Sequence, residues 1–170
     1  MKVAVKDACV LIDLANGALL DAWFQLGIET FTTDLVIRQV TAADQWREVS
    51  VFIEAGLLRV ESLTGEQIER MSETLADLRI GVEDQSALFL AIERRAVLLT
   101  GDRRLRIEAG KRHVEVRGLL WVLDELVSRG VVPPTLAALK LQSMRTNGAR
   151  LPNNECDERL RRWTLGQGEG

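Results

Sequence analysis

Three aspartates are spaced so that they could form a hydrolytic metal site. Asp84 stands at the start of the apolar run QSALFLAIERR, Asp102 follows the short apolar segment 96–100, and Asp7 follows a Val-rich segment at the N-terminus. Carboxylate oxygens are the ligands that Mg²⁺ and Mn²⁺ prefer, and one water of such an ion can become the nucleophile for a phosphodiester. If the three side chains meet, they predict a site of this kind.

The lengths of two consecutive elements bring Asp84 and Asp102 level. A helix over residues 84–95 rises about 18 Å, and a strand over residues 96–100 returns about 16 Å. If the helix packs antiparallel on the strand, its start lies beside the strand's carboxyl end. Asp7 ends another strand, and the carboxyl ends of parallel strands share one edge of a sheet. Three carboxylates at one edge repel one another unless a cation is present, so we predict that Asp7, Asp84 and Asp102 bind Mg²⁺ or Mn²⁺.

Apolar periodicity and turn residues predict alternating strands and helices. We expect strands over residues 2–6, 28–32, 57–60, 96–100 and 113–116. Helices are expected over residues 10–24, 33–55, 66–78, 84–95 and 118–128, with a basic connection at 103–112. This alternation is typical of a three-layer α/β/α sandwich around a mostly parallel five-stranded sheet.

The C-terminal part has a different character. Pro133-Pro134 and Pro152 each open a helix. The last five residues are three glycines with Gln167 and Glu169, so they contain no large apolar side chain. We therefore expect an α/β domain over residues 1–130, a helical appendage packed on that domain over 131–165, and a flexible tail at 166–170.

Composition restricts the class of protein. The 170 residues carry a net charge of −3, which argues against a broad surface that coats nucleic acid and leaves only local basic patches. Cys9 and Cys156 lack the spacing of a zinc site or a disulfide framework. No run approaches the ~18 apolar residues of a membrane span, so we predict a cytoplasmic protein without a membrane segment.

Several segments resemble the PIN domain family of metal-dependent ribonucleases, which includes toxins of the VapC type. They are DACVLIDL with Asp7, EDQSALFLAIERRAVLLTGDRRLR with Asp84, Thr100 and Asp102, then TTDLVIRQV and GLLWVLDELVSRG. The similarity covers residues 1 to about 145. It implies a five-stranded parallel sheet, a site for Mg²⁺ or Mn²⁺, endonucleolytic cleavage of RNA, frequent dimerisation and often a neutralising antitoxin protein.

The sequence departs from the family at two positions. Gln39 stands where the family usually has a glutamate, and a neutral amide can orient a water but adds no negative charge to hold a cation. We expect weaker metal binding, which Glu83 beside Asp84 could compensate. Cys9 follows Ala8 where the family commonly has a hydroxyl, and we interpret it as a small buried residue rather than a nucleophile.

Each aspartate also has a structural explanation. Asp7 and Asp102 could cap the segments that follow them, and Asp84 could be a first-turn acid favoured by the helix dipole. Their joint position favours the metal site. Three other aspartates are assigned to solvated helix faces, namely Asp13, Asp34 and Asp124.

Residues beside the predicted site could bind the substrate. Arg103 and Arg104 could receive RNA phosphates or form a solvated face, and Thr100 completes this predicted set. His113 has no partner for a catalytic triad and is expected to be structural. The four tryptophans are expected in the core or an interface, with Trp163 the most exposed.

Three hypotheses follow. The first is an endoribonuclease, the toxin of a toxin–antitoxin pair and a homodimer, in which Asp7, Asp84 and Asp102 bind metal and Gln39 positions a ligand or water. The second is a PIN-fold module with weak or no catalysis that binds RNA or a protein partner, which Gln39 favours. The third, phosphoryl transfer with Asp7 as nucleophile, lacks a second aspartate two positions later and an obvious late lysine.

Overall fold

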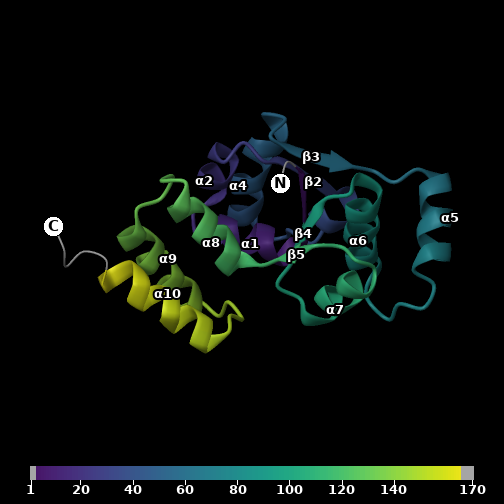
Figure 1. Ribbon diagram of the computed structural model, residues 1–170. Coiled ribbons are helices and arrows are strands. Elements are labelled where there is room, and N and C mark those ends of the chain that lie inside the picture. The colour runs from purple at the N-terminus through teal and green to yellow at the C-terminus, as the bar shows by residue number, and fades with distance from the viewer. Residues whose placement is uncertain (1–2, 166–170) are drawn as a thin grey trace.

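A computed structural model describes residues 3–165 of the chain. Its five strands form one parallel sheet in the order β3-β2-β1-β4-β5 (Figure 1). The strands are β1 (Val3–Lys6), β2 (Glu29–Thr33), β3 (Leu58–Glu61), β4 (Val97–Leu99) and β5 (Val116–Arg117). Strand β1 lies at the centre, with β2 and β3 on one side of it and β4 and β5 on the other. The direction in which the chain adds strands therefore reverses at β1. Ligands bind at such a reversal in open α/β sheets.

Ten helices connect and follow the strands in the described part of the chain. They are α1 (Ala8–Asn16), α2 (Leu20–Gln25), α3 (Asp34–Ile37), α4 (Ala43–Glu54), α5 (Gly65–Thr74), α6 (Val82–Arg94), α7 (Arg103–Lys111), α8 (Leu119–Ser128), α9 (Pro134–Thr146) and α10 (Asn153–Leu165). The mixed α/β class with parallel strands agrees with the sequence prediction. No helix among residues 3–165 combines the length and apolar character needed to cross a membrane.

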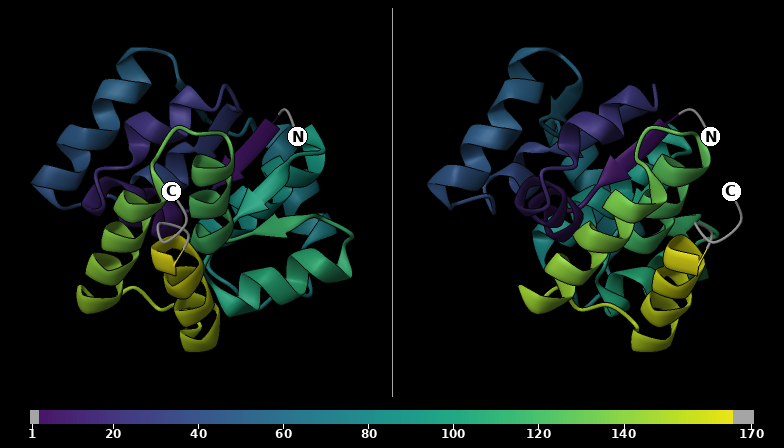
Figure 2. Two further views of the ribbon diagram at one scale, coloured as in Figure 1. Left: turned by 60° about the vertical axis from the view of Figure 1, so that its left-hand side comes forward. Right: turned by 90° about the vertical axis from the view of Figure 1, so that its left-hand side faces the viewer.

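Helices lie on both sides of the sheet. Helix α6 packs against β1, β2 and β4 on one side, and α1, α2, α4 and α8 gather on the other (Figures 1 and 2). The buried face of α6 is a continuous apolar run that contains Leu88, Phe89 and Leu90, each at most 2% exposed. The start of α6 therefore has a fixed place at the edge of the sheet.

The C-terminal helices pack against the α/β part. Helix α9 contacts α8 and α10, and α9 and α10 lie side by side (Figure 2). Met144 of α9 approaches α1 so closely at Gly17 that its Cε would be 2.2 Å from a side-chain carbon placed there. Asp124 of α8 accepts from Arg159 at 2.6 Å and pairs with Arg162 at 2.5 Å, so it joins α10 to α8.

Asp124, which was assigned to a solvated helix face, is partly exposed and pairs with these two arginines. One prediction about this region is wrong. Trp163 is 3% exposed rather than the most exposed tryptophan, whereas Trp46 of α4 is 44% exposed. Arg159 and Arg162 of the same helix pair with Asp124 of α8, and the guanidinium of Arg162 lies 5.8 Å from the centroid of the Trp163 ring. The predicted tail at 166–170 lies outside the described residues.

Two predicted helices are each interrupted. The helix expected over 10–24 ends at Asn16 and resumes at Leu20, because Ala18 takes a left-handed φ of 50°. The helix expected over 33–55 stops after Ile37, and the extended backbone of Ala42, with ψ 131°, sets a new direction for α4. Turn conformations, which apolar periodicity does not report, made both differences.

The predicted basic connection at 103–112 is a helix. In α7 the buried side chains are Leu105 and Ala109, which lie on the same face at i and i+4. All other positions are charged or exposed, so the apolar signal is too sparse to stand out. The strand expected at 113–116 accordingly starts later, and His113 lies exposed in the preceding turn with φ 57°.

Candidate active site

An acidic pocket of about 290 Å³ lies at the carboxyl end of the central strands. Its lining contains Asp7, Asp84, Asp102 and Gln39, which come from four separate segments of the chain. Cys9 and Ile12 of α1 form the apolar part of its wall. The tertiary structure thus brings together four residues that are spread along the sequence from Asp7 to Asp102.

Asp7 is held in a fixed orientation at the end of β1. Its backbone N–H donates to the carbonyl of Leu99 at 3.1 Å, which ties the ends of β1 and β4 together. Its carboxylate caps α1 by accepting from the N–H of Val10 at 3.0 Å, and it also accepts from the hydroxyl of Thr100. Asp7 is 2% exposed, and this burial raises the pKa of its carboxyl above the ordinary value despite these hydrogen bonds.

Cys9 adds a further donor to Asp7. Its Sγ lies 3.1 Å from both carboxylate oxygens of Asp7. Burial and the neighbouring charge of Asp7 raise the pKa of the thiol, so Cys9 stays protonated and is no nucleophile. In the position where the family commonly has a hydroxyl, this thiol helps to orient the carboxylate.

Asp102 occupies the start of α7. Its Oδ1 accepts from the N–H of Leu105 at 2.8 Å, and its own N–H donates to Oγ1 of Thr100 at 2.9 Å. Thr100 therefore contacts both Asp7 and Asp102. The capping explanations of Asp7 and Asp102 are correct as far as they go. Each cap uses one acceptor site of a carboxylate that has about four, which leaves capacity for a cation.

Asp84 lies in the first turn of α6, two residues after the helix begins at Val82. Within residues 3–165 its carboxylate forms no hydrogen bond or ion pair. Partial burial, followed by the charges of Asp7, Asp102 and Glu83, raises the pKa of Asp84 from 3.8 to about 6. Burial is the largest cause of this rise, and the like charges across the pocket add to it, while the positive end of the helix dipole acts in the opposite direction.

A chain of hydrogen bonds sets the start of α6 beside α3. Ser86 donates to the carbonyl of Glu83 at 2.6 Å and, 2.7 Å away, its hydroxyl oxygen meets Oγ1 of Thr33. Thr33 in turn accepts from the N–H of Val36 and so caps α3. Gln39 follows α3 directly, so this network fixes its distance from Asp84. No signal in the sequence indicated Ser86, which resembles any small residue on a buried helix face.

The donors in the pocket fit a hard divalent cation in type and charge. They are carboxylate oxygens and one amide oxygen, and both causes of the raised pKa of Asp84, burial and the neighbouring negative charges, would be offset by a bound cation. Within residues 3–165, no three Asp, Glu, His or Cys side chains are gathered closely enough to surround a metal ion as they are placed. The carboxylates are therefore spread around the pocket rather than focused on one point.

The predicted substrate residues lie in different places. Thr100 is fully buried and orients the aspartates, so the prediction that it contacts substrate does not fit its position. Arg103 lines a larger neighbouring cavity, whereas Arg104 is exposed and lines neither that cavity nor the acidic pocket. Arg106, which sequence analysis did not single out, donates to the carbonyl of Thr100 at 3.0 Å. Because residues 103–112 were expected to form a connection rather than a helix, no signal in the sequence indicated that Arg106 turns toward Thr100.

Asp13 of α1 was wrongly assigned to a solvated face. It is half-buried and lines the larger cavity, and burial together with Asp7 raises the pKa of its carboxyl. Asp34 does lie at a helix surface, where it pairs with Arg38 at 3.4 Å. Asp13 therefore adds a fourth acid near the pocket, on the side away from Asp84.

The cap at Asp102 gives a testable prediction. We expect Asp102→Ala to lower the free energy of unfolding by about 1 kcal/mol because α7 loses its N-cap, whereas Asp102→Asn keeps an oxygen for Leu105 and stays within about 0.5 kcal/mol. Both variants should bind Mn²⁺ more weakly. Urea denaturation and calorimetric titration measure the two effects separately. A large loss of stability for Asp102→Asn in metal-free buffer would mean that the charge itself holds the fold.

The raised pKa of Asp84 predicts a pH dependence of stability. Asp84 has a pKa of about 6 in the folded protein and 3.8 in the unfolded chain. Its ionisation therefore lowers the free energy of unfolding fully above pH 6 and not at all below pH 3.8. In EDTA, wild type should therefore gain about 1 kcal/mol from this group as pH falls from 7.5 to 4, after allowance for solvent screening. Thermal unfolding of Asp84→Asn should lack this gain at low pH. If Asp84→Asn and wild type showed the same dependence of stability on pH, the raised pKa of Asp84 would be contradicted.

A parallel α/β sheet with carboxylates around the ends of its central strands is a nuclease-like arrangement. The family described as DUF3368, PIN domain, matches the chain over residues 3–165. The protein belongs to this family, and the PIN resemblance of the sequence is confirmed. Among curated proteins, none matches the chain.

Proposed function

We propose that the protein is a metal-dependent endoribonuclease. The observation that carries the proposal is one pocket lined by Asp7, Asp84 and Asp102, in a chain that belongs to a PIN-domain family. Burial and the neighbouring charges of Asp7, Asp102 and Glu83 raise the pKa of Asp84, and this unfavourable placement of a negative charge supports a cationic ligand. RNA as the substrate comes from the resemblance of the sequence to metal-dependent ribonucleases.

The residues of the pocket would divide the work. Asp7, Asp84 and Asp102 would hold Mg²⁺ or Mn²⁺ through the carboxylate lone pairs that their hydrogen bonds leave available. When bound, such an ion supplies positive charge at the phosphodiester and lowers the pKa of water. Thr100 and Cys9 keep the carboxylate of Asp7 in place, which limits the reorganisation needed during the reaction. The amide of Gln39, exposed at the pocket, would orient a water or a phosphate oxygen.

The direct test is RNA cleavage. The purified chain should cut a single-stranded RNA that is blocked at both ends when Mn²⁺ or Mg²⁺ is added, and EDTA should stop the reaction. Blocked ends separate internal cleavage from removal of terminal nucleotides, and a DNA of the same sequence tests selectivity for RNA. If RNAs of several sequences all remained intact with either ion, the proposal that the protein is a ribonuclease would be overturned.

A second function is favoured by one observation. Gln39 lines the pocket without contributing charge, and the three aspartates are not gathered on one point. Both features suit a PIN-fold module that binds RNA or a protein partner with little or no catalysis. Metal-independent binding with no cleavage would support the module.

The cellular role that we propose is the toxin of a toxin–antitoxin pair, with an antitoxin protein as partner and a homodimer as the assembly. The resemblance to VapC-type toxins supports it. Helix α4 carries exposed Trp46 and Val51, a surface where a second copy could pack. Expression of the wild-type chain should then arrest bacterial growth while Asp84→Asn does not.

A further inference from the structure

A second cavity, which we call the groove, adjoins the acidic pocket and is rich in arginine. Its volume is about 490 Å³, and it lies between the starts of α7 and α8 on one side and the segment that enters α10 on the other. Five arginines line it against only two acids, Asp13 and Glu155. The arginines are Arg103, Arg106, Arg117, Arg150 and Arg159. Since the whole chain has a net charge of −3, this local excess of positive charge is a distinct feature.

Two of these arginines are free to bind a ligand. Arg106 donates to the carbonyl of Thr100, Arg117 pairs with Glu115 at 2.8 Å, and Arg159 pairs with Asp124. Arg103 and Arg150 are exposed and form no hydrogen bond or ion pair within residues 3–165. Arg103 belongs to α7, and Arg150 precedes α10, so the two free guanidinium groups come from different walls of the groove.

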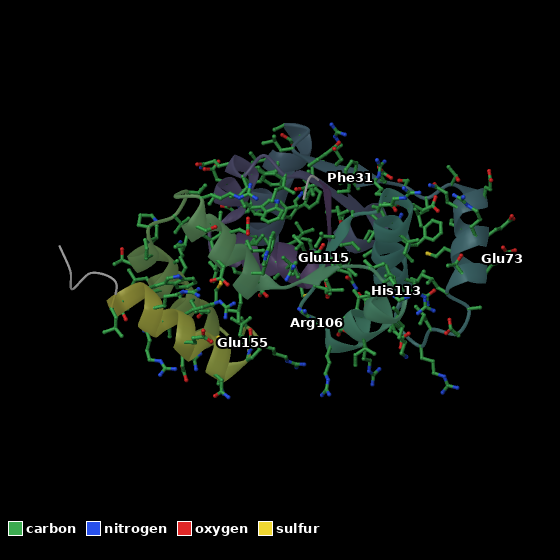
Figure 3. All side chains as sticks on the ribbon, viewed as in Figure 1. Phe31, Glu73, Arg106, His113, Glu115 and Glu155 are labelled. Atoms are coloured by element: carbon green, nitrogen blue, oxygen red, sulfur yellow. The ribbon has the colours of Figure 1, made fainter. Side chains whose placement is uncertain are left out.

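The groove lies directly beside the acidic pocket. Val10 and Gly101 line the groove, and their chain neighbours Cys9 and Asp102 line the pocket. The N–H of Gly101 donates to Sγ of Cys9 at 3.2 Å, so only these two short segments separate the cavities. Figure 3 shows the labelled Arg106 beside α7 and Glu155 on α10, the two elements that face each other across the groove. A ligand that leaves the acidic pocket on this side meets the arginines next.

An aromatic ring completes the lining. Trp121 of α8 is half-buried, with its ring edge-to-face on Trp23 at 6.5 Å and the guanidinium of Arg117 at 5.9 Å from its centroid. Rings supported in this way, interleaved with arginines, are how proteins bind single-stranded nucleic acids, because bases stack and phosphates pair with guanidinium groups. Trp121 also packs against the core, as predicted for the tryptophans.

We propose that this groove binds the single strand of RNA that flanks the phosphodiester in the acidic pocket. Arg103 and Arg150 contact phosphates from opposite walls, and Trp121 offers a surface on which a base stacks. The C-terminal segment 150–159 is then half of the nucleic-acid site rather than a structural appendage. The proposal rests on the proposed ribonuclease function for the identity of the strand. An acidic peptide would also suit the arginines, but it would not use Trp121 or continue naturally into a site for a phosphodiester.

The test is RNA binding in EDTA, where cleavage cannot interfere. Fluorescence anisotropy with a labelled single-stranded RNA should show that the double variant Arg103→Ala/Arg150→Ala binds about tenfold or more weakly and that its salt dependence is shallower by about one to two phosphate contacts. Arg103→Lys/Arg150→Lys keeps both charges and should recover most of the affinity. The matched control is Arg79→Ala/Arg161→Ala, which removes two exposed arginines outside the groove and should stay within about twofold of wild type.

The outcomes separate this proposal from the ribonuclease. If the control variant bound RNA as weakly as Arg103→Ala/Arg150→Ala, the proposed role of the groove would be overturned, because RNA binding would then depend on overall charge. Binding of a Glu-rich peptide but not RNA, lost in Arg103→Ala/Arg150→Ala, would also overturn it. If arginine-dependent RNA binding occurs without any cleavage in Mn²⁺, the groove stands and the ribonuclease fails. If cleavage in Mn²⁺ proceeds with an unchanged KM in Arg103→Ala/Arg150→Ala, the ribonuclease stands and the groove fails.

Discussion

Asp84→Asn is expected to lower the rate of RNA cleavage by about 100-fold or more while the protein folds normally. The expected loss corresponds to about 2.7 kcal/mol in transition-state stabilisation. It follows because Asp84 is one of the three charges available to hold the cation, and an amide in its place neither balances that charge nor binds as strongly. Cleavage in Mn²⁺ under single-turnover conditions measures the chemical step directly.

Asp84 is the best of the three aspartates for this experiment. Asp7 and Asp102 cap helices, so their removal mixes loss of structure with loss of chemistry. Asp84 supports no hydrogen bond within the described residues and is repelled by its neighbours, so Asp84→Asn should be at least as stable as wild type at pH 7.5. Glu73→Gln on the remote helix α5 removes the same charge as a control (Figure 3). Full activity in Asp84→Asn would place any nuclease centre elsewhere.

Gln39→Glu is expected to bind Mn²⁺ about tenfold more tightly than wild type, a gain of about 1.4 kcal/mol, and to raise any cleavage activity. Gln39 lines the acidic pocket, where a fourth carboxylate adds charge to the donor set. In metal-free buffer the same change should lower stability, because it increases the repulsion already present at Asp84. Titration calorimetry and thermal unfolding in EDTA measure these opposite effects.

Gln142→Glu serves as the matched control, since it adds the same charge at an exposed position on α9. Unchanged Mn²⁺ affinity in Gln39→Glu would mean that residue 39 does not reach the cation. The variant also distinguishes the two functions. Cleavage that appears only in Gln39→Glu would identify the wild-type chain as a binding module that lacks one charge for catalysis.

The α/β class and the meeting of the aspartates could be predicted because they depend on local signals. Strands of apolar β-formers end at Asp7 and just before Asp102, and parallel strands must place these ends at one edge. The matched lengths of the expected helix over residues 84–95 and the expected strand over 96–100 then bring in Asp84. The observed strands begin one to three residues later than expected, because the limits of an apolar run do not coincide with those of the hydrogen-bonded ladder. The interruption after α3 was missed because it depends on backbone dihedral angles, to which apolar spacing is insensitive.

By itself, the sequence determined which donors are available: three carboxylates, an amide at position 39 and a thiol at position 9, each beside an element that could be located. Only the tertiary structure decided that Thr100 lies beneath Asp7 and Asp102, that Ser86 and Thr33 lock α6 to α3, and that Trp163 is buried. The same is true of the arginine groove, whose walls come from residues 103 and 150. These contacts join segments separated by tens of residues, and their energies come from packing and burial, which arise only when the chain closes on itself.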